Sequence, residues 1–234
     1  MTPRGLWLIF ACIGLLALPL TMPLATGLRW VGPRDLAART VSGSLWGGQL
    51  QQARLGRIRL GDVTLGLEPL PLLIGRTWVR IEAGGGDAQA KGRLRISRNA
   101  SGADALSATV PLAALGLSGG WGGDVSLRDF SVDFRKGACR EASGRVTATI
   151  NGLGDGPVSL TGRPVCQGRS LVAALSGGAN GATAGLTLRL EANGRYQIEA
   201  VVQTADPALG AILAADGFTT APGGYRRTVE GRLG

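Results

Sequence analysis

The chain has 234 residues, of which 44% are hydrophobic and 39 are Gly, and its formal charge is +9. Because Gly is spread along the chain and does not recur at every third position, the composition excludes a collagen-like protein and is typical of short strands joined by tight turns. The absence of His excludes a Ser-His-Asp triad and a His-containing zinc site. The basic residues, all Arg except Lys91 and Lys136, are scattered and form no run longer than two, which argues against a nucleic-acid-binding protein.

The first predicted element is an apolar run over residues 6–25 that contains no charged side chain. A helix needs about 20 apolar residues to cross the hydrocarbon core of a bilayer, so we predict a transmembrane helix over residues 6–26. Residues 1–5 are then cytoplasmic and residues 27–234 are exported, since long domains translocate largely regardless of their charge. The alternative is a signal peptide that is cleaved near Thr26.

A short helix and a Gly-rich motif are predicted next. Pro33, as the first helical residue, predicts one or two helical turns over residues 33–39. Gly43, Trp46 and Gly48 follow as a Trp flanked by Gly on both sides. We expect this segment to be a structural motif in which the Trp is a core anchor.

Apolar and polar residues alternate through most of the exported part, which predicts half-buried strands. The alternation is clearest over residues 58–67, 78–82, 93–97, 130–135, 146–150, 186–191 and 196–202. Pro69 and Pro71 interrupt it and predict a connecting loop or an edge. Asp206, as an acidic cap, and Gly217, just past the end, bracket a predicted helix over residues 207–215.

These patterns predict an all-β protein, with a twisted and curved antiparallel sheet and few short helices after one transmembrane helix. The Gly-flanked Trp121 resembles the segment around Trp46. This similarity suggests two related β halves, over residues 41–110 and 111–234. The alternative is a chance similarity in a Gly-rich chain.

The chain has three Cys residues. Cys12 lies inside the apolar run and is expected to be a small apolar filler. Cys139 and Cys166 lie in the exported part, and two such Cys residues usually pair in an oxidising compartment. The alternative is a pair of buried free thiols, and the absence of His disfavours a metal site.

The sequence contains no motif that indicates catalysis or cofactor binding. It has neither a Gly-x-x-x-x-Gly-Lys-Ser/Thr loop nor a Gly-x-Gly-x-x-Gly fingerprint after a strand. Asp129 and Asp133 share one face of a strand, as a carboxylate pair would require, but that face is the polar one and is expected to be solvated. We therefore predict a protein that is not an enzyme, with no cofactor, no metal and no small-molecule substrate.

Several segments together resemble a known family. They are the N-terminal apolar run, residues 43–48, the two Cys-containing segments 137–144 and 160–168, and the closing segments 194–196, 206–209, 217–218 and 223–225. Over nearly the whole chain they resemble protein N of the bacterial type II secretion system, the general secretion pathway protein N family. The resemblance implies an accessory inner-membrane component of the machine that exports folded proteins across the outer membrane. It implies a single-pass protein whose bulk is periplasmic, other secretion subunits as partners, and no chemistry.

Two functional hypotheses follow. In the first, the sheet docks against other secretion subunits through an edge strand or an exposed face. In the second, a curved sheet with an apolar inner face handles inner-membrane lipid and resembles the AsmA-like periplasmic proteins. An apolar face covered by helices and a second sheet favours the first hypothesis, and an open apolar groove favours the second.

Overall fold

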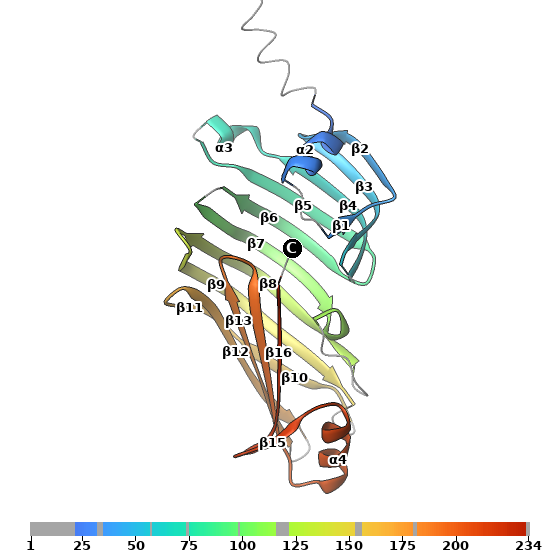
Figure 1. The fold of residues 1–234 in the computed structure, drawn as a ribbon, viewed down its shortest axis with the longest axis vertical. Coiled ribbons are helices and arrows are strands. Elements are labelled where there is room, and N and C mark those ends of the chain that lie inside the picture. The colour runs from blue at the N-terminus through green and yellow to red at the C-terminus, as the bar shows by residue number, and fades with distance from the viewer. Residues whose placement is uncertain are drawn as a thin grey trace, which may run out of the picture.

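Strands dominate the part of the chain that the structure describes (Figure 1). The computed structural model describes residues 22–31, 35–56, 58–73, 75–97, 99–115, 122–152, 156–179 and 182–232. In these residues 16 strands form one twisted, open antiparallel sheet, accompanied by a few short helices. The prediction of an all-β, antiparallel protein is confirmed.

The strands follow one another closely along the chain. They are β1 (Leu36–Ala37), β2 (Thr40–Ser44), β3 (Gly47–Leu55), β4 (Ile58–Leu67), β5 (Trp78–Gly85), β6 (Gln89–Ile96), β7 (Ala100–Pro111), β8 (Gly122–Arg135), β9 (Ala138–Asn151), β10 (Val158–Gly162), β11 (Pro164–Gln167), β12 (Ser170–Ala179), β13 (Ala182–Glu191), β14 (Arg195–Gln203), β15 (Thr219–Ala221) and β16 (Gly224–Arg232). The helices are α2 (Leu24–Val31), α3 (Pro69–Leu73), the 3₁₀ turn η1 (Leu112–Leu115) and α4 (Pro207–Ala215).

Strands that are neighbours in the sequence are also neighbours in most of the sheet. The order is β1-β3-β4-β5-β6-β7-β8-β9-β10-β12-β13-β14-β16-β15, with β2 also beside β3 and β11 also beside β12. Antiparallel neighbours need only short connections, which accounts for the frequent Gly and polar turns in the sequence. The two ends of this order are not paired with each other in the described part, so the sheet stays open.

The predicted period of two sorts side chains between the two faces of the sheet. In β9, Val146, Ala148 and Ile150 are buried, whereas Thr147 and Thr149 on the opposite face are only partly buried. Successive side chains of a strand point to opposite faces, so the alternation read from the sequence becomes one apolar and one polar face. We call the face opposite the buried apolar residues the polar face.

Two buried clusters lie on the apolar face. A small N-terminal cluster joins α2 to β3, β4 and β5 through Leu24, Leu50, Ala53, Val63 and Ala83. A larger cluster extends from β7 to the strands and helix at the C-terminal end, and it includes the fully buried side chains Val146, Leu160, Leu171, Ile198 and Leu213. Strand β6, between the two clusters, has no fully buried side chain. The sheet runs without interruption across the predicted junction near residue 110, and the relation between two halves stays a prediction.

Helix α4 confirms the helix predicted from its capping residues. The carboxylate of Asp206 accepts a hydrogen bond from the backbone nitrogen of Ala208 at 2.8 Å, which satisfies one of the free N–H groups of the first turn. Gly217 follows the helix with φ of +83°, a conformation that favours Gly. Leu209 and Leu213 are buried in the larger cluster, so this helix closes the C-terminal end of the core.

The helical turns predicted over residues 33–39 are wrong for the part that the structure describes, from residue 35 onward. Leu36 and Ala37 form β1 and pair with Leu55 and Arg54 of β3. Leu36 packs against the N-terminal cluster. An isolated helix of one or two turns is marginal in water, so burial of Leu36 against the sheet outweighs the signal from Pro33.

Most of the predicted transmembrane helix, residues 6–21, lies outside the described residues. The last residues of that prediction are described, and they contact the sheet. The carbonyl of Met22 accepts a hydrogen bond from the backbone nitrogen of Leu45 at 3.2 Å, and Leu24 at the start of α2 is buried. In the described part of the chain, no helix combines the length and the hydropathy needed to span a bilayer.

Candidate functional site

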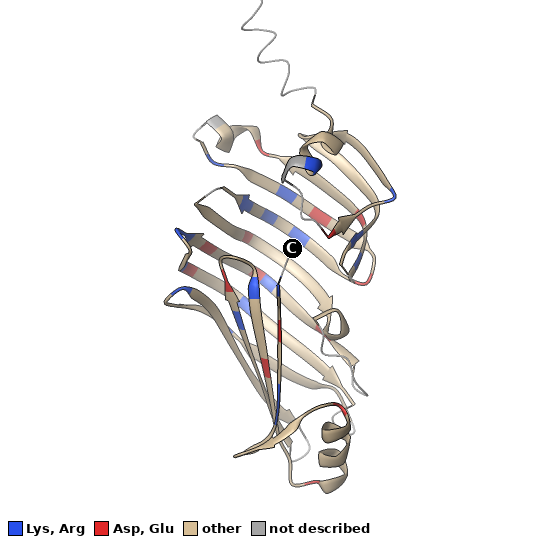
Figure 2. Ribbon diagram, in the orientation of Figure 1, with Lys and Arg blue, Asp and Glu red and all other residues tan. Residues whose placement is uncertain are grey.

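The polar face of the sheet carries cross-strand pairs of charged residues where β5 meets β6. The register places Trp78 opposite Arg95, Arg80 opposite Arg93 and Glu82 opposite Lys91. Residues directly opposite each other in an antiparallel pair lie on the same face with their Cβ atoms about 5 Å apart. Acidic and basic residues are accordingly interspersed across this part of the sheet (Figure 2).

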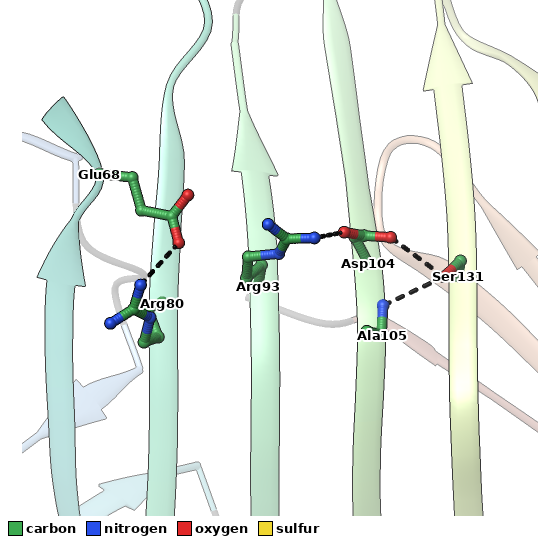
Figure 3. A network of polar contacts seen from close by, with 6 residues as sticks. All are labelled: Glu68, Arg80, Arg93, Asp104, Ala105 and Ser131. Carbon is green, nitrogen blue, oxygen red and sulfur yellow. Dashed lines mark hydrogen bonds and ion pairs between the residues drawn. The ribbon is translucent and has the colours of Figure 1, made fainter. Parts of the chain in front are cut away.

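Carboxylates from the flanking segments compensate the two opposed guanidinium groups of β5 and β6 (Figure 3). Arg80 donates to Glu68, which follows β4, at 3.1 Å, and Arg93 donates to Asp104 of β7. The Arg93 guanidinium also lies over the ring of Trp78, 5.6 Å from its centroid. Each Arg of this pair therefore has its own counter-charge.

The network continues from β7 to β8 through hydroxyl and backbone groups. The Ser131 hydroxyl donates to Asp104 at 3.4 Å and accepts from the backbone nitrogen of Ala105 at 3.1 Å. Ala105 has φ of +48° at a register shift in β7. The side chain of Ser131 thus satisfies a backbone group that the bulge removes from the strand ladder.

The most sheltered ion pair of the polar face joins Arg95 of β6 to Asp133 of β8 at 3.2 Å, with about one fifth of each side chain exposed. Asp133 also accepts from Arg135 at 2.6 Å. By contrast, Lys91 and Glu82, 3.4 Å apart, are largely exposed. Exposed ion pairs contribute about 0–1 kcal/mol each, so this arrangement determines where charge lies on the face more than it stabilises the fold.

A second charged feature lies beside β4 and β5. Arg59 forms a two-pronged ion pair with Asp87, at 2.8 and 3.0 Å, and this hydrogen bonding raises the pKa of Arg59 above its ordinary value. Gly61 and Gly86 line the same shallow hollow. Their backbones approach so closely that a side chain on either residue would meet backbone atoms of the other segment within 2.6 Å.

Cys139 and Cys166 form a disulfide, as predicted, and their Cα atoms are 5.4 Å apart. Pairing between β9 and β10 ends at Val146 and Gly162. Beyond that point the chain continues as β11, which pairs with β12 instead. The disulfide therefore joins β9 to β11 where no strand ladder is formed between them, and Cys139 is buried in the larger cluster.

The Gly-flanked Trp motif forms the tip of the β2–β3 hairpin, in which Gly43 pairs with Gly48. Gly43 has φ of +88°, and a side chain at this position would meet backbone atoms of residues 47 and 48 within 2.8 Å. A Cβ atom at Gly48 would lie 2.4 Å from the Leu24 side chain of α2. Gly43 is thus required by the close approach of the two strands of the hairpin, and Gly48 by the packing of the hairpin against α2. Trp46 in the turn is half-buried.

A family model described as "Type II secretion system (T2SS), protein N" matches residues 34–228, which include the sheet from β1 into β16. The chain belongs to the type II secretion system protein N family. No curated protein and no solved structure matches the chain. For this family member, the disulfide predicted between Cys139 and Cys166 is present, whereas Trp121 lies outside the described residues.

Sequence reasoning about this protein N family member missed the cross-strand pairs of the polar face. Arg80 and Arg93 lie apart in the sequence, and only the strand register brings them opposite each other. The sequence signal that could have indicated these pairs is the occurrence of opposite charges at alternate positions of successive strands.

In the described part of the chain, no group of three or more acidic, Cys or His residues is placed to hold a metal ion. Asp133 is engaged by two Arg residues, and Asp129 lies at a bulge with φ of +48°.

Proposed function

We propose that this protein is an accessory inner-membrane component of the type II secretion system that supports export of folded proteins across the outer membrane through contacts with other subunits. The family match over residues 34–228 carries the proposal. The polar face adds support, because it presents charges and hydroxyl groups in positions set by the strand register. Such a surface gives specificity through electrostatic complementarity with a protein partner.

The proposed topology has a cytoplasmic N-terminus, one membrane span over residues 6–26 and a periplasmic body. The uncharged apolar run of residues 6–25 supports the span. The disulfide between Cys139 and Cys166 supports an oxidising compartment for the body. Maleimide labelling in intact spheroplasts tests this proposal, with single Cys residues introduced on the polar face of a Cys12→Ala chain that keeps the disulfide. Protection of these introduced Cys residues would contradict it.

A lipid-handling, AsmA-like function would require an open apolar groove. The two hollows described on the surface are lined by other kinds of residue. One lies among Asp133, Arg135, Lys136, Arg140 and Glu141 at the end of β8 and β9. The other lies between Arg59 and Asp87 beside Gly residues. Neither hollow is suited to an acyl chain, so we propose the subunit-contact function and keep lipid handling as an outcome of its test.

Gene deletion followed by complementation with the full chain tests the proposed function. We expect a substrate of the secretion system to accumulate in the periplasm of the deletion strain and to return to the medium on complementation. Normal secretion without the protein would contradict the proposal. In parallel, the full chain is purified from native membranes. Phospholipid that copurifies without any secretion subunit would favour the lipid-handling alternative.

A further inference from the structure

The central region of the polar face contains an Arg pair that lacks a counter-charge. Arg128 of β8 lies directly opposite Arg145 of β9. Both residues are exposed, and neither makes a hydrogen bond or an ion pair with another residue of the described chain. Like charges directly opposite each other in a sheet are destabilising, so this pair is maintained at a cost to the fold.

Other opposed Arg pairs on the same face show how the chain otherwise compensates such positions. Arg80 and Arg93 each have a carboxylate partner. Arg54 lies opposite Arg59, and Arg59 is held by Asp87. A further pair, Arg195 and Arg232, lies next to the chain end that the structure does not describe. Away from the two chain ends, Arg128 and Arg145 are thus the opposed Arg pair of the described residues in which neither side chain has a carboxylate partner.

A backbone bulge holds the Arg pair in place. The register passes from Arg128 opposite Arg145 to Ser131 opposite Ser143, so two residues of β8 face Gly144. The first of them, Asp129, has φ of +48°. A side chain at Gly144 would meet the carbonyl oxygen of Asp129 and the Cα of Phe130 at 2.7 Å. The bulge therefore depends on Gly144, and it sets the register in which Arg128 lies opposite Arg145.

Hydroxyl-bearing residues flank the pair, and the carboxylates on its strands make no ion pair with it. Ser126 lies opposite Thr147, and Thr147 lies opposite Thr161 of β10. Along their own strands the nearest acidic residues are Asp124 and Asp129 of β8 and Glu141 of β9. Asp124 accepts a hydrogen bond from Ser126 at 3.4 Å, and none of the three makes an ion pair with Arg128 or Arg145. The large apolar side chains that are exposed in the described chain, Leu70, Ile96, Val165 and Ile212, lie on α3, β6, β11 and α4. Binding at a membrane surface draws on buried apolar area as well as charge, and the strands that carry the pair offer no such area.

We propose that Arg128 and Arg145 form a docking site for an acidic segment of a partner protein, whose carboxylates supply the missing counter-charge. This inference rests on the proposed function, because it treats the partner as a protein of the secretion assembly. Arg donates parallel hydrogen bonds to carboxylates, and such charge-assisted bonds are roughly twice as strong as neutral ones. The flanking Ser and Thr hydroxyls donate to or accept from the same partner.

Photo-cross-linking in cells tests the docking site. A benzoylphenylalanine is introduced at Thr147 of the full chain, in a strain that has a working secretion system. The Arg128→Gln/Arg145→Gln variant is compared with the Arg195→Gln/Arg232→Gln variant, which removes an opposed Arg pair from β14 and β16 at the C-terminal end of the sheet. We expect a cross-link to a protein that falls about tenfold in the first variant and stays within about twofold in the second. Charge reversal at Arg128 and Arg145 is expected to remove the cross-link. Lys in place of the partner's carboxylates at the cross-linked site is expected to restore it.

Several outcomes would overturn the inference. They are the absence of any protein adduct, an adduct with phospholipid alone, equal loss in both variants, or failure of the charge swap. Thermal unfolding provides an independent measurement: Arg128→Gln/Arg145→Gln is expected to keep or raise the midpoint, whereas a lowered midpoint would show that the chain itself compensates the pair. The two proposals can fail separately. If the deletion strain fails to secrete but the cross-link is unchanged in the Arg128→Gln/Arg145→Gln strain, this inference is refuted and the proposed function stands.

Discussion

Removal of the disulfide between Cys139 and Cys166 is expected to destabilise the body of the protein strongly. The bond closes a loop with a sequence separation of 27. In the chain-entropy model, a loop of this length contributes about 3.5 kcal/mol at 25 °C. The structure gives no compensating ladder between β9 and β11, because pairing between β9 and β10 ends at Gly162. The Cys139→Ala/Cys166→Ala variant should therefore lose most of this contribution.

Thermal unfolding of the full chain measures the effect. For a protein of this size, 1 kcal/mol corresponds to a change of about 2–4 °C in Tm, so we expect Tm to fall by about 7–14 °C. Wild-type protein treated with a reductant should behave like the double variant, and Cys12→Ala, which leaves the disulfide intact, serves as the matched control. A decrease of less than about 2 °C in the double variant would refute the reasoning that the bond holds β9 to β11 in the absence of hydrogen bonds.

Three further substitutions test the packing and capping of the fold, each by urea or thermal unfolding. Gly48→Val should destabilise by about 2–3 kcal/mol, since even a Cβ atom would lie 2.4 Å from the Leu24 side chain; an unchanged midpoint would show that α2 does not pack on the hairpin. Leu160→Ala removes a side chain with 0% exposure and should cost about 2–5 kcal/mol, whereas Ser159→Ala on the exposed face should have little effect. Asp206→Ala removes the cap of α4 and should cost about 1 kcal/mol, and a neutral result would argue against the capping bond.

The order in which the strands form the sheet could be anticipated in outline, but the position of each charge on it could not. The polar face depends on bulges that the residue types do not announce, because Gln52 and Ala105 have positive φ values without being Gly, Asn or Asp. Each bulge adds a residue to one strand and changes which side chains face each other across the next pair. A one-residue error in register would move a side chain to the other face, so the Arg pairs could not be assigned from periodicity.

The sequence by itself determined the features that depend on neighbouring residues. The alternation of Val146, Ala148 and Ile150 predicted a strand with one buried face, and the sequence around Asp206 predicted where α4 begins. The tertiary structure decided the features that depend on distant residues. Leu36 is part of a strand because β3 offers it a partly buried position beside the N-terminal cluster. Arg128 lies opposite Arg145 because the bulge at Asp129 sets the register. The physical reason is the distance along the sequence over which each effect acts. Backbone preference acts over a few residues, whereas burial and strand pairing depend on segments that only the folded sheet brings together.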